Sequence, residues 1–198
     1  MEKRNFLNKR IGAVGARAEV IELFAVVTVI LVMTLILPLA FAGNNVVNNQ
    51  FLVGATVNCA LIIAGISFRG ILRTFGIVFL PSVIALLSGL ILSMGSVYML
   101  YMIPAIWLGN ASVVFGFKYL YTHKKLNFAL TSAIIIALKA GFIFAGYNLL
   151  LAIGLIPAGS PVAETLFTAM GLNQLITATL GCIAAFGVVK ISYRQANS

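Results

Sequence analysis

Charged side chains are scarce in this sequence, and acidic side chains are the scarcest of all. Only 9% of the 198 residues are charged, with 4 Asp and Glu against 13 Lys and Arg. Charged residues make up about a quarter of a typical soluble domain. Mean hydropathy is +1.10, and 62% of the residues are hydrophobic. One core of this size cannot bury so much apolar surface, so the sequence excludes an ordinary soluble domain and predicts an all-α integral membrane protein.

Residues for metal, disulfide and covalent chemistry are equally few. The single histidine, His123, cannot build a metal or haem site of the usual kind, so we expect no metal and no cofactor. The two cysteines, Cys59 and Cys182, lie in apolar runs at depths that differ by about 10–15 Å by helix rise, which argues against a disulfide between them. The spans contain no Ser/His pair, paired aspartates or HExxH set, which predicts that the protein is not an enzyme.

The cations that are present divide the chain into alternating segments. The predicted membrane spans are residues 20–42, 51–67, 74–93, 99–119, 127–156 and 165–189. Twelve of the 13 Lys and Arg lie in the basic N-terminal segment 1–18, in the second and fourth loops and after the last span, and the other three loops hold none. The positive-inside rule then predicts six spans with both termini cytoplasmic. We expect the membrane to be the plasma membrane of a prokaryote. Basic residues so widely scattered do not favour nucleic-acid binding.

Polar residues inside the predicted spans gather at one level of the membrane. Counted at about 1.5 Å per residue, they fall in the outer half or near the midplane. The set comprises Asn58, Asn110, Lys139, Asn173 and Gln174. Asn148 lies farther out on the span of Lys139 and points to the opposite side of a straight helix, so it joins the set only if that helix bends. We take all six as candidate substrate-binding residues.

Lys139 carries the functional argument. An ammonium group inside hydrocarbon costs about 2.5–3.5 kcal/mol on insertion scales and therefore faces a partner or a wet cavity. The sequence offers no acid near its depth, because the acidic residues of the chain lie in the N-terminal segment, at the inner end of the first span and in the loop 157–164. An anionic ligand that enters from the outer face would neutralise this charge. A deprotonated, uncharged Lys139 is the alternative, because burial disfavours the charged form. The sequence thus predicts a pocket for a small anionic or zwitterionic molecule, with loops 43–50 and 157–164 at its mouth.

A purely structural interpretation accounts for some of the same residues. Single asparagines in spans often form interhelical hydrogen bonds worth about 0.6 kcal/mol each, and Asn58 or Asn110 alone fits that role equally well. Lys139 is harder to explain this way, because its stem reaches only about 6 Å and neither membrane interface is so close. Tyr98, Tyr101 and Trp107 are typical of an interfacial aromatic belt.

Two apolar phrases give the chain a family resemblance. Residues 79–89 read FLPSVIALLSG, and residues 102–110 read MIPAIWLGN. With six predicted spans, cytoplasmic ends and outward polar groups, the chain resembles the substrate-binding S components of energy-coupling factor (ECF) transporters. The resemblance implies capture of a vitamin-like micronutrient at the outer face. It also implies docking on a transmembrane coupling protein driven by two ATPase subunits. Family members often dock through small residues spaced four apart in span one, whereas residues 25–29 here read AVVTV and are mostly bulky.

Another class of function is compatible with the same composition. A membrane anchor or quinone-side subunit of a larger redox complex would also be small and apolar, with Lys139 as a proton or quinone contact. The absence of paired histidines and of several buried acids weakens that alternative. A stand-alone secondary carrier is less favoured still, because the sequence shows neither coupling-ion acids nor broken helices in repeated halves.

Overall fold

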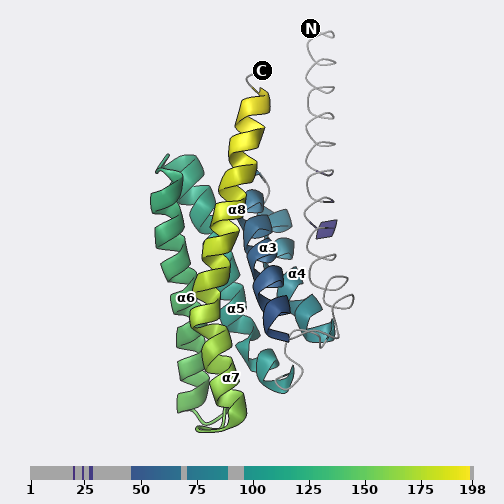
Figure 1. The fold of residues 1–198 in the computed structure, drawn as a ribbon, viewed down its shortest axis with the longest axis vertical. Helices are drawn as coiled ribbons and strands as arrows, with labels where there is room; N and C mark the ends of the chain where they lie inside the picture. Colours follow the sequence, from purple (N-terminus) through teal and green to yellow (C-terminus); the bar gives the residue numbers. More distant parts are fainter. Residues whose placement is uncertain are drawn as a thin grey trace.

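The protein is an all-helical bundle in the part of the chain that the structure describes (Figure 1). This computed structural model describes residues 46–67, 71–88 and 96–196, together with the helical residues 20, 24, 27 and 28. No strand occurs among these residues. The N-terminal segment 1–18 and nearly all of the predicted first span lie outside them. The helical class that the sequence predicts is confirmed for the described residues.

Six α-helices and one π-helical segment make up residues 46–196 as far as the structure describes them. They are α3 (Val46–Ser67), α4 (Ile71–Ser88), α5 (Ser96–Gly116), η2 (Phe117–His123), α6 (Phe128–Ala152), α7 (Pro161–Met170) and α8 (Leu172–Ala196). η2 continues α5 as a π-helix. Successive long helices alternate in direction, and α7 lies at the end of the bundle opposite the C-terminus (Figure 1).

Local sequence explains where the last helices begin. Asn127 caps α6, because its side chain accepts a hydrogen bond of 2.7 Å from the backbone of Leu130. Ser160 caps α7 in the same way, and the proline that follows it stands in the first turn, where a missing N–H costs nothing. Gly154 and Gly159 have positive φ angles of 75° and 71°, which makes the sharp turns between α6 and α7 acceptable.

Several boundaries differ from the sequence prediction, and three of the differences affect the predicted loops and the last span. Helix α3 begins at Val46, so most of the asparagine-rich segment expected as loop 43–50 forms the first turns of a helix instead. The predicted last span, 165–189, consists of two helices that meet at Gly171. Residues 161–164, expected in the preceding loop, form the first turn of α7. Asparagine or serine inside a helix costs less than about 1 kcal/mol relative to alanine, so an apolar helix beside such a segment extends through it.

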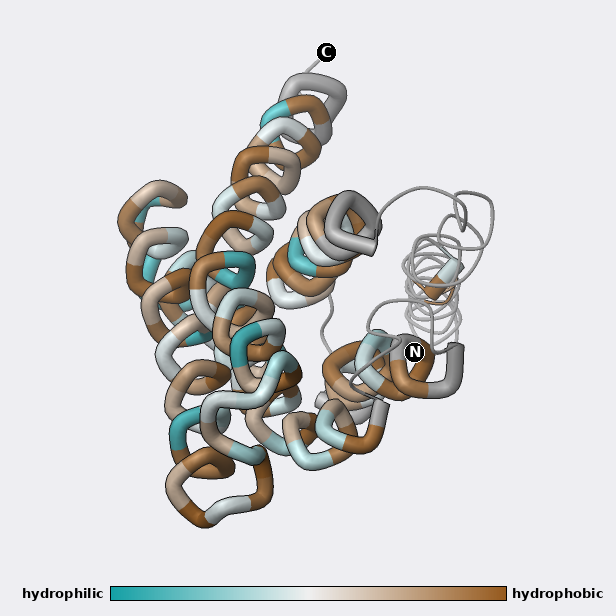
Figure 2. Tube along the Cα trace, turned by 60° about the horizontal axis from the view of Figure 1, so that its bottom comes forward, coloured by the Kyte–Doolittle hydropathy of each residue, from teal (hydrophilic) through white to brown (hydrophobic). Residues whose placement is uncertain are grey.

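Among the described residues, three helical segments are long and apolar enough to cross a membrane: Val97–His123, Phe128–Ala152 and Pro161–Ile191. Shorter apolar helices cover Phe51–Ser67 and Thr74–Ile84. Hydrophobic residues run along every helix and are not confined to one side (Figure 2). Large apolar side chains such as Ile183 and Phe167 are 65% and 55% exposed on the bundle surface. An exposed surface with so many large apolar side chains is typical of a membrane protein, in which lipid and not water surrounds these side chains.

Glycines lie in the two most extensive helix pairings. On α8, a Cβ added at Gly181 would lie 2.9 Å from the carbonyl oxygen of Ala55 on α3, so these helices approach backbone to backbone. On α5, a Cβ at Gly109 would lie 2.9 Å from the side chain of Ile143 on α6. The bundle therefore contains two tight pairs, a parallel α3–α8 pair and an antiparallel α5–α6 pair. Lys139 of α6 points to the place where the pairs meet.

Candidate functional site

The side chain of Lys139 ends between two asparagines in the middle of the bundle. Its Nζ donates hydrogen bonds to Oδ1 of Asn58 on α3 and to Oδ1 of Asn110 on α5, the second at 3.0 Å. All three residues are buried, with exposed fractions of 3%, 2% and 2%. Three residues that the sequence predicted to lie at one depth thus share a single hydrogen-bonded centre, which we call the lysine centre.

Asn110 connects this centre to a fourth helix. Its Nδ2 donates to the backbone carbonyl of Val78 on α4 at 3.1 Å, while its Oδ1 accepts from Lys139. The amide therefore has its oxygen fixed toward the ammonium and its nitrogen fixed toward a carbonyl. The acceptor oxygen of the amide thus meets a donor, and the donor nitrogen meets an acceptor. Lys139, Asn58 and Asn110 tie four helices together through three side chains.

The charge of the lysine centre has no acidic partner in the described part of the chain. The one carboxylate side chain there is that of Glu164, which is exposed in the first turn of α7 at the end of the bundle. Amide oxygens solvate an ammonium group but do not neutralise it. When Lys139 is protonated, the centre has a net positive potential inside an apolar bundle, and such a site favours an anion.

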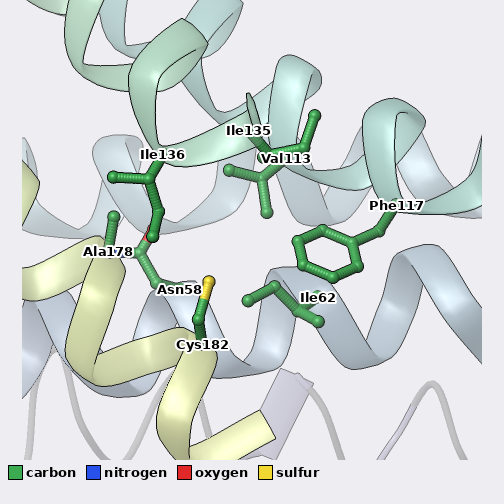
Figure 3. A pocket seen from close by; sticks show the side chains of 8 residues that line it. All are labelled: Asn58, Ile62, Val113, Phe117, Ile135, Ile136, Ala178 and Cys182. Carbon is green, nitrogen blue, oxygen red and sulfur yellow. The ribbon is translucent and has the colours of Figure 1, made fainter. Parts of the chain in front are cut away.

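The lysine centre is closed in this structure. The cavity beside it has a volume of about 10 Å³, near the lower limit for one water molecule. Side chains from α3, α5, η2, α6 and α8 converge on this space, and Asn58 is the one amide among them (Figure 3). A ligand larger than water reaches Lys139 only when helices move apart.

The structure separates the other predicted site residues from this centre. Residues 58 and 181 are level on the parallel helices α3 and α8, which places Asn173 about 12 Å from that level. Asn173 is buried there, and the amide of Gln174 donates to the backbone of Ala169 at 3.1 Å. Asn148 is exposed, and its amide donates to Phe144 of its own helix at 2.7 Å. These residues form no part of the lysine centre.

The depth error has one cause, which also affects the cysteines. Depths counted from the sequence assume that all spans start level at the outer surface, but α7 lies beyond the first turn of α3 (Figure 1). Cys59 and Cys182 therefore lie at nearly the same level: a Cβ on Gly181 would be 3.0 Å from the backbone nitrogen of Cys59. The predicted separation of 10–15 Å is wrong, although both thiols are free in this structure.

Two polar contacts near the site were not foreseen. Ser132 is buried on α6 and faces the thiol of Cys182, and its Oγ has no hydrogen-bond partner within normal distance. It lies seven residues before Lys139, a spacing that places both on one helix face and makes it recognisable from sequence. Trp107, expected in an interfacial belt, is only partly exposed, donates to the hydroxyl of Ser82 at 2.7 Å and packs edge-on against Phe79.

Comparisons with known proteins add no relative to this description. No protein family, no curated protein and no solved structure matches the chain.

Proposed function

We propose that the protein is a substrate-binding membrane subunit for uptake of a small anionic or zwitterionic micronutrient. The observation that carries this proposal is the ammonium group of Lys139, buried between Asn58 and Asn110 without an acid among the described residues. Retaining an unneutralised charge in the interior of a membrane bundle is costly, and intramembrane ionisable residues are for that reason functional by default. An anion at this point would neutralise the charge that the amides only solvate.

The structural interpretation predicts a different outcome for the same residues. If Lys139 only holds helices together, removal of its charge changes stability and leaves binding at other sites unchanged. If it is an anion site, removal of its charge abolishes binding while the bundle persists. The two roles are therefore separated by measurements of binding and stability on the same variants.

The test is native mass spectrometry of the full chain, gently purified from its membrane. We expect one small anion per chain in the wild type, loss of that mass in Lys139→Met, and its retention in Lys190→Met. Lys190 is an exposed lysine of α8 and serves as the matched control. Asn110→Asp is a sharper variant, because it places a carboxylate beside Lys139 and should displace the anion while keeping the polar contact. A wild-type chain without a bound anion, or a Lys139→Met variant that retains it, contradicts the proposal.

The proposed subunit has six spans with both termini cytoplasmic, and it works with a membrane coupling protein and two ATPase subunits. The cation distribution and the resemblance to S components support this arrangement. Single cysteines test the topology: in intact cells a membrane-impermeant maleimide should label Ala158→Cys in the predicted outer loop and should not label Lys124→Cys. Co-purification of flavin or iron–sulfur subunits in place of ATPases would favour the alternative function, a membrane anchor of a redox complex.

A further inference from the structure

A lateral groove runs along the boundary between α6 and α8 on the exposed side of the bundle. It has a volume of about 400 Å³, which is within the range of pockets that bind small molecules. Its walls include Phe128, Ala133 and Ile136 from α6 and Thr179, Ile183 and Phe186 from α8. These residues recur at helical spacing, so the groove follows the helix axes. We call it the α6–α8 groove.

The α6–α8 groove offers no free polar group to an occupant. Two hydroxyl side chains line it, and no charged side chain of the described residues does so. The hydroxyl of Thr179 donates to the carbonyl of Leu175 on its own helix at 2.8 Å. That of Ser132 is buried against the thiol of Cys182. The groove therefore suits an apolar chain.

The length of the groove matches an acyl chain of one membrane leaflet. From Phe128 to Ile136, α6 rises by about 12 Å. The hydrocarbon core of a bilayer is about 30 Å thick, which leaves about 15 Å for each leaflet. Because the groove follows two helices that are long and apolar enough to cross a membrane, a chain in it would lie in the direction of the other acyl chains.

Each wall of the groove leads to a lysine at the end of the bundle opposite α7 (Figure 1). The rings of Phe128 and Phe186 meet there at 5.3 Å between centroids. On α8, Lys190 follows Phe186 by one turn on the same helix face and is exposed. On the other wall, Lys125 stands three residues before Phe128 and is also exposed. Two cations therefore lie where the apolar groove ends.

The backbone holds Lys125 beside the start of α6. Its φ angle of 56° turns the chain from η2 toward α6. The N–H of the next residue, Leu126, donates to the carbonyl of Leu120 on η2 at 3.0 Å, and Asn127 caps α6. The short connection is thus fixed on both sides, which keeps Lys125 near the end of the groove.

The neighbouring Lys124 is directed elsewhere. Its Nζ lies 5.5 Å from the ring centroid of Tyr119. Phe117 and Tyr121 both contact Phe128 of the groove. Tyr119 lies between these two residues in sequence, and side chains two apart on a helix do not face the same way. Lys124 is therefore a cation of the same connection that turns away from the groove.

We infer that the α6–α8 groove and the lysines at its end form a binding site for an anionic phospholipid. One acyl chain occupies the groove, and the phosphate lies by Lys125 and Lys190. Charge complementarity argues for an anionic headgroup, because this end of the described bundle supplies cations, whereas its one described carboxylate, Glu164, lies at the opposite end. Basic pockets between membrane helices bind such headgroups in other proteins.

The experiment is native mass spectrometry of the full chain, stripped of lipid in detergent and titrated with lipid. The probes are phosphatidylglycerol and phosphatidylcholine with the same palmitoyl and oleoyl chains. We expect the wild type to bind phosphatidylglycerol about 25-fold more tightly, because each lysine near a headgroup contributes about fivefold. Lys125→Gln and Lys190→Gln should each reduce this preference about fivefold. Lys124→Gln is the matched control and should leave the preference unchanged.

Two exposed alanines on α6 test the groove separately from the lysines. Ala133 lines the groove, whereas Ala145 lines none of the described cavities. Ala133→Trp fills space that the acyl chain would occupy. If it leaves two methylene groups of that chain unburied, both lipids should bind about tenfold more weakly, with the preference for phosphatidylglycerol retained. Ala145→Trp should leave the binding of both lipids unchanged.

Three results would overturn the inference. Equal binding of the two lipids by the wild type would show that the groove holds any bilayer chain. A loss of preference in Lys124→Gln as large as that in Lys190→Gln would show a diffuse basic surface and no defined site. Wild-type lipid affinity in Ala133→Trp would show that the acyl chain lies outside the groove.

This inference goes beyond the proposed function and fails separately from it. Cys182 is nearly level with the lysine centre, and Lys190 follows it by about 12 Å of helix rise. The variants of the lipid site should therefore keep the small anion that Lys139→Met loses. Loss of the lipid preference with the anion retained supports both sites. Retention of the lipid preference in Lys125→Gln and Lys190→Gln contradicts the lipid site alone.

Discussion

Replacing Asn110 by leucine should destabilise the bundle more than any other exchange of asparagine for leucine in the described helices. The variant keeps the side-chain shape but removes an acceptor for Lys139 at 3.0 Å and a donor to Val78 at 3.1 Å. In water-soluble proteins these bonds contribute about 1.5–3 and about 0.5–1.5 kcal/mol. Interhelical bonds in bilayers average only about 0.6 kcal/mol. We therefore expect a loss of about 1–3 kcal/mol in the free energy of unfolding.

The assay is reversible unfolding of the purified protein in mixed micelles. The fluorescence of Trp107, the single tryptophan of the chain, reports the transition from the same helix as Asn110. Asn148→Leu is the matched control, because that amide is exposed and donates only to its own helix. We expect the control to change stability by less than about 0.5 kcal/mol. Equal losses in the two variants would refute the reasoning that the lysine centre holds the helices together.

Three further variants test the packing around the site. Gly181→Leu should separate α3 from α8 and lower the free energy of unfolding by about 1–3 kcal/mol through overpacking. Gly187→Leu on the same helix should leave stability unchanged, because a Cβ there meets nothing within 4 Å. Thermal unfolding of both variants in micelles checks this difference. Tyr147→Phe removes the 3.0 Å hydrogen bond to the carbonyl of Ala163 and should lower the free energy of unfolding by about 1 kcal/mol, as measured by the same titration. Asn127→Ala removes the cap of α6 and should cost about 1 kcal/mol and increase amide exchange in its first turn.

The lysine centre was predictable because its residues obey simple counting. Asn58 and Asn110 lie on helices that have no break in the relevant stretch, so 1.5 Å per residue places them correctly beside Lys139. Hydropathy identified the apolar helices for the same reason: it depends on composition over about twenty residues and not on any single contact.

The predicted depths of Asn173 and the two cysteines were wrong because counting residues gives comparable depths only if all spans begin at the same level. Helix α7 lies beyond the first turn of α3 and is joined to α8 at Gly171, so the predicted last span begins farther out than its neighbours. A single glycine in an apolar run does not reveal such a break, because glycine is also frequent within intact spans. The sequence also could not predict that the lysine centre is closed, because closure depends on how side chains from several helices pack into one space.

We expect the two tight helix pairs to move against each other as the arms of a hinge. Helix α3 also meets α5 closely at Gly65, where a Cβ would lie 2.5 Å from the carbonyl oxygen of Val114, near the end of the bundle farthest from α7. We expect the pairs to pivot there and part at the opposite end, which distance measurements between spin labels on α3 and α6 would show as widening on ligand binding. Lys139 and Asn110 belong to one arm and Asn58 to the other. Separation of the two helix pairs would break the hydrogen bond of Lys139 to Asn58 and keep the one to Asn110. One N–H of the ammonium group would then be free to bind an incoming anion.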